Sequence, residues 1–252
     1  IKSKELRPGW DWTFYCILGK AGRLDEVVQN AGGKIIYSRV SISNKFSFLR
    51  HLRKTLKEGK FDILHAHHDY LSGFYLLASA GISFKKRIVH VHNTDRALPV
   101  GSRALERLLL KPFRTLALYF ADLVVGISNE TLRGFAGQRE GEKYKVLYYG
   151  VDMGRFEISA DIAAYRTELN LPNGSKLLLF AGRMNLFKNP VFVVDVLAEL
   201  LKLCPDVYAI FAGTGEEEER VKERAAMLNV TSNIRMLGWR EDGISLMQVS
   251  DV

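Results

Sequence analysis

The chain has 252 residues, of which 47% are hydrophobic and 25% are charged, and its formal net charge is +8. These values are typical of a globular protein with a buried core, and they exclude an intrinsically disordered chain. The length exceeds that of an average single domain, so we expect two domains. The positive charge favours partners that carry phosphate, such as nucleotides, nucleic acid or anionic lipid, without choosing among them.

The two cysteines, Cys16 and Cys204, lie far apart in the sequence. Such sparse usage favours a reducing compartment and argues against a disulfide scaffold or a cysteine zinc site. The first residues lack the apolar core of a signal peptide, and no apolar stretch reaches the ~20 residues of a membrane helix. We therefore expect a cytoplasmic protein. The chain begins with Ile1 and ends in "QVSDV", which resembles the start of a strand, so we expect both ends to be cut.

Short apolar runs alternate with longer helical patterns along the chain. The apolar runs predict strands covered on both faces at residues 13–19, 34–40, 62–67, 87–93, 122–128, 145–150, 176–182, 207–213 and 233–239. Helical patterns occupy about 22–31, 45–58, 70–80, 102–120, 129–137, 190–203, 216–228 and 242–249. This alternation predicts an α/β fold with doubly wound parallel sheets.

The segment 151–175 interrupts the alternation. It is more polar than its surroundings and ends in a Pro-Asn-Gly-Ser turn signal. We therefore predict a first Rossmann-like domain over 1–152, a linker over 153–175 and a second Rossmann-like domain over 176–252, both domains being incomplete.

Glycines and cations follow the predicted strands of the second domain. In open parallel sheets, ligands bind beyond the carboxyl ends of the strands. Arg183 and Lys188 lie between a strand and a helix that is expected to begin with Asn189 as N-cap and Pro190 at its first position. A helix N-terminus has unpaired N–H groups and a partial positive charge, so this loop suits a diphosphate clamp. Two solvated loop cations explain the same spacing equally well.

The stretch "FAGTGEEEER" at 211–220 places Gly-x-Gly after a strand. It fails the dinucleotide fingerprint because Glu218 occupies the third glycine position, and its acidic run would repel a pyrophosphate. A Rossmann dehydrogenase is therefore disfavoured. Gly213 and Gly215 either let backbone approach a ligand or form a tight turn.

Histidines and other polar residues follow the predicted strands of the first domain: His65, His67, His90, His92, Asn93 and Ser128. Strand alternation puts His65 and His67 on one face of their strand, and it puts His90 and His92 on one face of the next strand. The spacing matches no known zinc site and Asp69 is the only nearby carboxylate, so we expect no metal. Core histidines bonded to backbone are the simplest explanation, and the lining of a substrate cleft is the functional alternative.

Basic residues gather in the helical stretches 46–60 and 102–120 and in "FKKR" at 84–87. A basic amphipathic face can contact an anionic membrane, whereas a solvated helix face is the simpler explanation. The sequence contains no recognisable nucleic-acid-binding motif, so we expect no nucleic-acid partner.

Six segments resemble, in order, motifs of one enzyme family: "DILHAHHDYLSGFYLLASAG", "RIVHVHN", "DLVVGISNETLRGF", "KVLYYGVDMGRF", "LLLFAGRMNLFKNPVFVVDVLAELLK" and "AIFAGTGEEEERVKERAAMLNVTSNIRMLGW". The chain resembles a retaining glycosyltransferase of the GT-B fold, family 4 (glycosyl transferases group 1). The resemblance covers nearly the whole chain. It implies transfer of a hexose from a nucleoside diphosphate (NDP) sugar to an acceptor hydroxyl, in the synthesis of a surface polysaccharide or glycolipid.

The resemblance also implies roles for individual residues. Arg183 and Lys188 match the pair that holds the diphosphate and stabilises its charge as it leaves. His92 matches a histidine near the donor sugar and acceptor. The positions that bind the donor nucleotide are matched by four glycines and a tryptophan: Gly182, Gly213, Gly215, Gly238 and Trp239. No cofactor or metal is implied, because the cations supply the positive charge.

Two family features have no counterpart in the sequence. Paired glutamates would follow the strand that starts at Asp251, and a first strand with a Gly-rich loop would precede residue 1. We therefore expect the fragment to be inactive and its parent protein active. The expected partners are an NDP-sugar and a glycan or lipid-linked acceptor, reached from the inner face of the membrane. An epimerase or phosphorylase of the same fold, or a non-catalytic basic protein that binds membrane or nucleic acid, remains an alternative.

Overall fold

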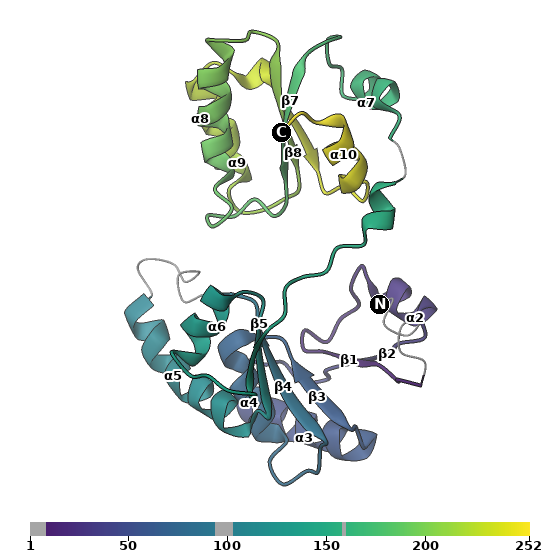
Figure 1. Ribbon diagram of the computed structural model, residues 1–252, viewed down its shortest axis with the longest axis vertical. Helices are drawn as coiled ribbons and strands as arrows, with labels where there is room; N and C mark the ends of the chain where they lie inside the picture. The colour runs from purple at the N-terminus through teal and green to yellow at the C-terminus, as the bar shows by residue number, and fades with distance from the viewer. Residues whose placement is uncertain (1–8, 94–102, 158–159) are drawn as a thin grey trace. The chain divides into compact units, whose positions relative to one another are not determined.

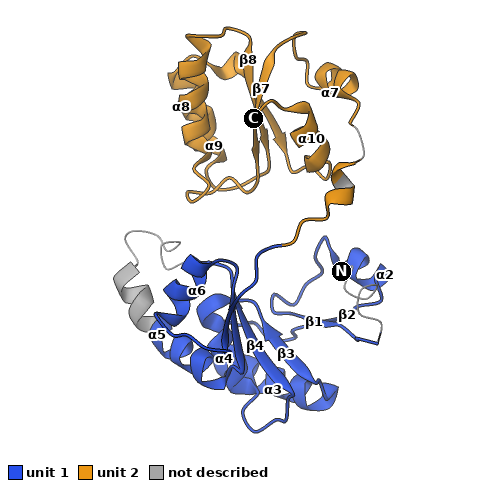
Figure 2. Ribbon diagram, viewed as in Figure 1, with its two compact units in different colours: residues 1–149 blue, residues 150–252 orange. Residues whose placement is uncertain are grey.

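The computed structural model describes residues 9–93, 103–157 and 160–252 and forms two compact units, residues 1–149 and 150–252 (Figures 1 and 2). Each predicted strand is present, and the strands pair in parallel throughout the described sheets. The predicted α/β class with parallel sheets is therefore confirmed.

Unit 1, residues 1–149, contains two parallel sheets. Their strands are β1 (Thr13–Cys16) with β2 (Lys34–Tyr37), and, in chain order, β3 (Ile63–Ala66), β4 (Lys86–Val91), β5 (Leu123–Gly126) and β6 (Tyr144–Val146). The helices are α2 (Asp25–Asn30), α3 (Lys45–Gly59), α4 (Ser72–Ala78), α5 (Arg103–Phe120) and α6 (Asn129–Ala136), with a 3-10 turn, η1 (Asp69–Leu71). Because the larger sheet is parallel, its strands all end at one edge, where the histidine segments lie.

The core of unit 1 forms between its larger sheet and its helices. Helix α3 buries Phe48, Leu52 and Leu56, which recur every fourth residue and so share one helix face. Val89 of β4 is fully buried in the same cluster. Helices α4 and α5 approach so closely that a Cβ on Gly73 would lie 1.8 Å from a backbone oxygen of α5, so this contact requires glycine.

Unit 2, residues 150–252, contains one parallel sheet of β7 (Lys176–Ala181), β8 (Val207–Ala212) and β9 (Ile234–Gly238). Its helices are α7 (Ile162–Glu168), α8 (Pro190–Leu201), α9 (Glu218–Met227) and α10 (Gly243–Val249), with 3-10 turns η3 (Met153–Phe156) and η4 (Thr231–Asn233). Figure 1 shows α8 and α9 on one face of this sheet and α7 and α10 on the other.

Both faces of the unit 2 sheet are buried. Ala209 and Phe211 of β8 pack into the cluster that includes α8 and α9. Ile210 and Ala212, which alternate with them, pack into the opposite cluster with Leu246 of α10. A strand buried on both faces needs a continuous apolar run, which is the pattern that predicted β8.

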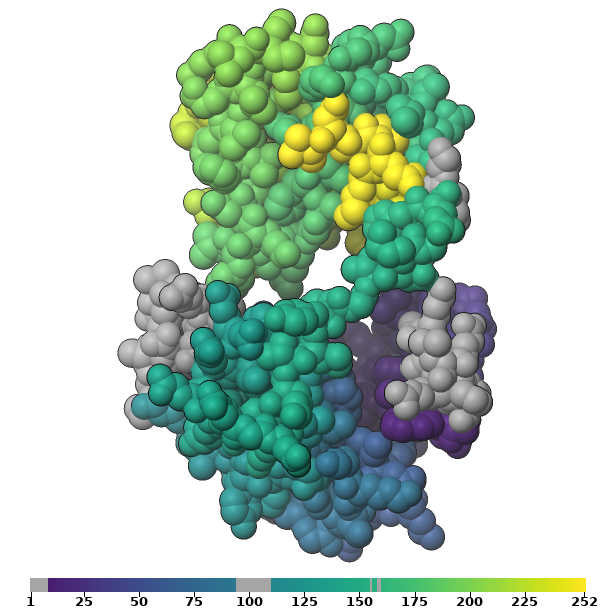
Figure 3. All heavy atoms as spheres, in the orientation of Figure 1, coloured from purple at the N-terminus to yellow at the C-terminus, as the bar shows by residue number. Residues whose placement is uncertain are grey.

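The structure divides the chain at a different place from the predicted linker over 153–175. Unit 2 begins at Gly150. The segment predicted to be a linker includes helix α7, which was not predicted. Tyr165 of α7 donates a hydrogen bond to Asp242 before α10 at 2.7 Å, and Leu169 is buried against the sheet. In Figure 3 the yellow C-terminal residues lie beside the teal residues of this segment on the surface of unit 2. The segment is therefore part of the unit 2 core.

None of the helices in the described ranges combines the length and the apolar character that a membrane span requires.

Candidate functional site

The loop after β7 is anchored by one buried side chain. Met184 is fully buried; its amide donates to Thr214 O at 3.0 Å, and its carbonyl accepts from the Glu217 amide at 3.0 Å. These bonds tie the β7 loop to the β8 loop. The preceding residue, Arg183, keeps its side chain 71% exposed, so a fixed backbone presents an exposed cation at the carboxyl edge of the sheet.

The same loop ends in a turn that leads into α8. Asn185 accepts from the Lys188 amide through both its carbonyl, at 3.1 Å, and its side chain, at 3.0 Å. Asn189 occupies the predicted N-cap position and Pro190 the predicted first position. Asn189 has a φ of 47°, and its side chain makes no capping hydrogen bond. Lys188 is thereby held beside the N-terminus of a helix.

The glycines after the three strands let these loops pack backbone against backbone. The Gly213 amide donates to Gly238 O at 2.7 Å, and the Gly182 amide donates to Ala212 O at 2.9 Å. A Cβ on Gly213 would lie 1.9 Å from Gly182 O, and one on Gly215 would lie 2.1 Å from the carbonyl oxygen of Met184. The two glycines of the β8 loop are therefore required by the contact between loops, whatever ligand lies beyond them.

Arg183 has a partner that the sequence analysis missed. Its guanidinium lies 3.1 Å from the Glu216 carboxylate. A hydrogen bond from the Glu216 backbone amide, and then the bond from Arg183, lower the pKa of this carboxyl. The acidic run after Gly-x-Gly was the available signal, but it did not indicate which glutamate would reach the cation. Trp239, 50% exposed, directly follows Gly238 at the end of β9.

In unit 1 the histidine rings lie against one another. The His65 and His67 ring centroids are 4.0 Å apart, and those of His90 and His92 are 4.5 Å apart. His67 Nδ1 lies 3.0 Å from His92 Nε2, within hydrogen-bonding distance. The rings of these four residues form no hydrogen bond to backbone in the described ranges, so the expectation of backbone-bonded core histidines is wrong.

Asp69 connects the ends of β3 and β4. Its carboxylate accepts from the His92 amide at 2.7 Å and from the Asn93 side-chain amide at 2.8 Å. Asp69 has a φ of 44°, which is uncommon for a residue with a side chain and is often seen at functional sites. The sequence analysis treated Asp69 only as a lone carboxylate, yet it holds both candidate residues that follow β4.

Tyr149 completes a row of hydrogen-bonded groups. Its hydroxyl pairs with His92 Nδ1, and the two rings stack with centroids 5.9 Å apart. Both ring nitrogens of His92 are thus engaged, one by His67 and one by Tyr149. No feature of "KVLYYG" pointed to this contact. Ser128, another candidate for the cleft, instead caps α6 by accepting from the Thr131 amide at 3.1 Å.

Three of these histidines resist protonation. Loss of water around the rings, and then repulsion from neighbouring imidazoles, lower the pKa of His65 to about 3 and that of His67 to about 4. Desolvation also lowers the pKa of His90. These three rings are therefore neutral at pH 7.

Comparison with protein families assigns both units. Residues 7–155 match the family model described as Glycosyltransferase Family 4, and residues 161–252 match Glycosyl transferases group 1. The chain belongs to glycosyltransferase family 4. The resemblance drawn from the six sequence segments is thereby confirmed.

The relatives of this family 4 chain include bacterial glycosyltransferases, one of which is named for capsular polysaccharide biosynthesis. EpsF of Bacillus subtilis (strain 168), assigned as a glycosyltransferase, is 29% identical over 233 residues, covering 90% of this chain and 60% of EpsF. The capsular polysaccharide biosynthesis glycosyltransferase CapH of Staphylococcus aureus is 24% identical over 237 residues, covering 92% and 62%. An Escherichia coli UDP-Gal:α-D-GlcNAc-diphosphoundecaprenol α-1,3-galactosyltransferase is 24% identical, covering 100% and 67%. The chain thus spans roughly three fifths of the length of the first two relatives.

Among solved structures, the family 4 chain is similar to Anabaena Alr3699/HepE in complex with UDP-glucose. The TM-score is 0.78 at 20% identity, covering 95% of this chain and 64% of HepE. This likeness confirms the GT-B fold of the two units.

Proposed function

We propose that the full-length protein is a retaining glycosyltransferase that moves a hexose from an NDP-sugar to a hydroxyl of a glycan or lipid-linked acceptor. The observation that carries the proposal is the anchored loop of unit 2, which presents Arg183 and Lys188 at the carboxyl edge of a parallel sheet and before a helix N-terminus. Family membership supports it, as do the names of two relatives, one for capsular polysaccharide biosynthesis and one for transfer to a diphosphoundecaprenol acceptor.

The two cations would act on the leaving group. When the bond between the sugar and the diphosphate breaks, negative charge grows on the diphosphate oxygens. A guanidinium, an ammonium and a helix N-terminus fixed in advance stabilise that charge more than they stabilise the bound substrate. Because the loop backbone is tied down by Met184, little reorganisation is needed as the charge develops. In this proposal the transfer requires no metal ion.

His92 would position the sugar or the acceptor. Its ring is fixed through both nitrogens and its backbone amide is held by Asp69. Because both ring nitrogens are engaged within the protein, His92 would present a fixed ring surface against which the sugar is oriented. In this proposal the acceptor hydroxyl attacks the anomeric carbon from the face that the diphosphate leaves, which retains the configuration.

The names of similar proteins support a more specific proposal for the donor and the acceptor. The E. coli relative is named for UDP-Gal and a diphosphoundecaprenol acceptor, and HepE structures contain UDP or UDP-glucose. We therefore propose a UDP-sugar donor and a lipid-linked acceptor, with the protein working in the cytoplasm at the inner membrane face. The net charge of +8 favours contact with anionic lipid there.

The experiment measures transfer by the full-length gene product from UDP-sugars to a lipid-linked acceptor. Arg183→Ala and Lys188→Ala should each lower kcat by ~10²-fold or more, because a preorganised charge at the leaving group is lost. Lys202→Ala is the matched control, since Lys202 is an exposed cation at the other end of α8, paired with Glu199. Wild-type rates in both site variants would overturn the roles, and an inverted anomeric centre in the product would overturn retention.

A further inference from the structure

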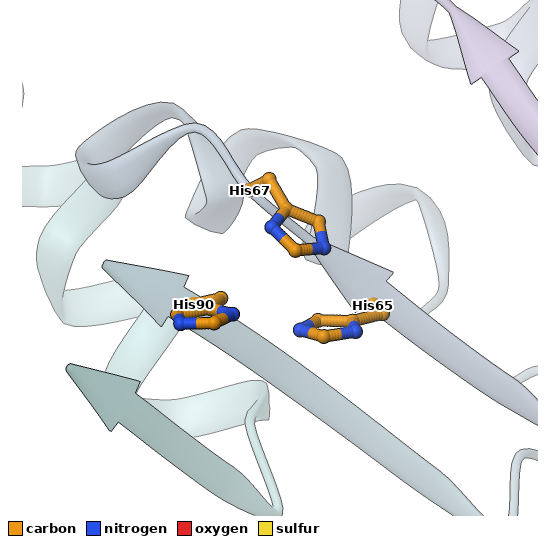
Figure 4. A group of neighbouring side chains, drawn as sticks. All are labelled: His65, His67 and His90. Atoms are coloured by element: carbon orange, nitrogen blue, oxygen red, sulfur yellow. The ribbon is translucent and has the colours of Figure 1, made fainter. Parts of the chain in front are cut away.

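Three histidines at the ends of β3 and β4 form a group that the proposed transfer reaction does not use. His65, His67 and His90 each offer a ring nitrogen, and these nitrogens all lie within 4.8 Å of one another. Figure 4 shows the rings of His65 and His90 facing each other across a gap, with His67 above it. We propose that these residues, here called the histidine trio, bind one Zn²⁺ ion.

The strongest sign of a missing partner is His90. This side chain is 93% buried, since its relative exposure is 7%, yet its Nε2 has no hydrogen-bond partner. A buried polar atom without a partner carries a desolvation cost of about 1–3 kcal/mol. Its ring plane lies within 3° of the His65 plane, with 5.5 Å between ring centroids. A metal ion between the two rings would use this orphaned nitrogen.

The trio already has the protonation state that a metal requires. Zinc binds neutral imidazole, and a histidine that must first lose a proton binds it less tightly. The low pKa values of His65, about 3, and of His67, about 4, keep both rings neutral at pH 7. Desolvation is the main cause of these low pKa values, and the repulsion that adds to it arises only between charged rings, so it does not oppose the neutral trio.

The three ring nitrogens need to move only slightly closer together to bind one ion. Zn–N bonds of about 2.0–2.1 Å in a tetrahedral site place the ligand nitrogens roughly 3.4 Å apart. His65 and His67 are exposed, so their side chains can rotate toward the buried His90. His67 uses Nδ1 toward His92, which leaves Nε2 for the ion. Three ligands leave the fourth position open to water.

A bound ion would also fix the protons on neighbouring rings. With Zn²⁺ on His67 Nε2, His67 carries its proton on Nδ1 and donates it to His92 Nε2. His92 then carries its proton on Nδ1 and donates to the Tyr149 hydroxyl. Partners of this kind orient metal ligands and raise their basicity. The trio is thus connected to His92 through one hydrogen bond.

The test titrates Zn²⁺ into untagged, chelator-treated full-length protein, with Cys16 and Cys204 replaced by serine and no sugar nucleotide present. Calorimetry should give one site per chain near pH 7.5. Co²⁺ should give the visible absorption of a four-coordinate site. His65→Asn and His90→Gln should each weaken binding by ~10-fold or more. His68→Gln, the matched control, should not, because His68 follows His67 in the chain but lies outside the trio.

Binding that is absent, or that is equally tight in His65→Asn and in the parent protein, would overturn the site. Circular dichroism checks that His90→Gln folds, and if it does not, the exposed His65→Asn decides alone. Arg183→Ala should bind Zn²⁺ like the parent protein, so the outcome is independent of the proposed transferase activity.

Discussion

The two units place their candidate site residues at the same position, the carboxyl edge of a parallel sheet, but hold them by different means. In unit 2, backbone bonds between glycine-rich loops fix the edge, and Arg183 stands out into solvent. In unit 1, side chains fix the edge: Asp69 clamps the loop after β4, and histidine rings pack on one another. The edge of unit 2 thus presents exposed cations to an anion, with Glu216 as the competing partner of Arg183, whereas the histidine rings that hold the edge of unit 1 are themselves the proposed metal ligands.

The charge states of the two edges differ as well. Unit 2 presents permanent cations, whereas three histidines of unit 1 are neutral at pH 7. All six histidines of the chain precede residue 150, so unit 2 contains none. Salt should therefore weaken ligand binding at the edge of unit 2, whereas a change in pH should alter the charge of the histidines at the edge of unit 1.

The prediction with the largest expected effect tests whether backbone packing between the loops stabilises unit 2. Gly182 and Gly213 have φ values of 151° and 148°, so alanine is strained at either. Only at Gly213 would the new Cβ also collide, at 1.9 Å, with a backbone oxygen. Gly213→Ala should therefore lower the free energy of unfolding by roughly 1–3 kcal/mol more than Gly182→Ala. Urea unfolding of both variants measures this difference, and equal losses would show that the loops are not closely packed.

The next effect tests whether side chains hold the edge of unit 1. Tyr149→Phe keeps the ring stacked on His92 but removes the hydroxyl that bonds its Nδ1. The transfer rate should fall by roughly 3–10-fold, as expected for loss of one hydrogen bond. Tyr148→Phe is the control, because Tyr148 is the adjacent, similarly exposed tyrosine. Equal transfer rates in the two variants would show that the Tyr149 hydroxyl does not help to position His92.

The strands were predictable because each is a continuous apolar run buried by its neighbours. Helix α7 was missed because its segment, 153–175, is polar, and only the buried Leu169 and the bond from Tyr165 to Asp242 bring it into the core. The Asn189 side chain does not cap α8 because the turn from Asn185 gives it a positive φ. Local preferences gave the position of the helix end, but tertiary contacts determined its geometry.

The candidate site divides in the same way. Arg183 and Lys188 could be named as candidates from the sequence, because they lie between a predicted strand and the helix that follows it, although spacing alone did not separate a diphosphate clamp from two solvated cations. The partners Glu216 and Tyr149 could not be named in this way, because they lie 33 and 57 residues away from the groups they contact. Such pairs depend on which loops pack together at the sheet edge. The histidines illustrate this limit, since alternation placed them on shared faces but could not show that the rings contact one another.

A smaller expected effect is a pH dependence of stability that differs between the two units. The folded-state pKa values of His65 and His67 lie below the usual 6.5. Below pH 6.5 the unfolded chain therefore binds more protons, and stability should fall progressively toward pH 4. Hydrogen exchange should show β4 opening more readily at pH 5 than at pH 7.5, with β8 unchanged. His65→Asn should reduce the pH dependence of β4, and an equal response of β8 would contradict the assignment to histidines.

The smallest effect concerns the ion pair that competes with a diphosphate for Arg183. Glu216 lies 3.1 Å from the guanidinium, and both side chains are largely exposed. Glu216→Gln should therefore raise the affinity for an NDP only about 2–5-fold, in keeping with exposed ion pairs. The gain should shrink at high salt. Glu219→Gln changes the net charge equally, but Glu219 pairs with Lys222 instead, so it should leave the affinity nearly unchanged. If Glu216→Gln lowered the affinity, Glu216 would be orienting Arg183 for the diphosphate, and side chains would hold the edge of unit 2 as they hold that of unit 1.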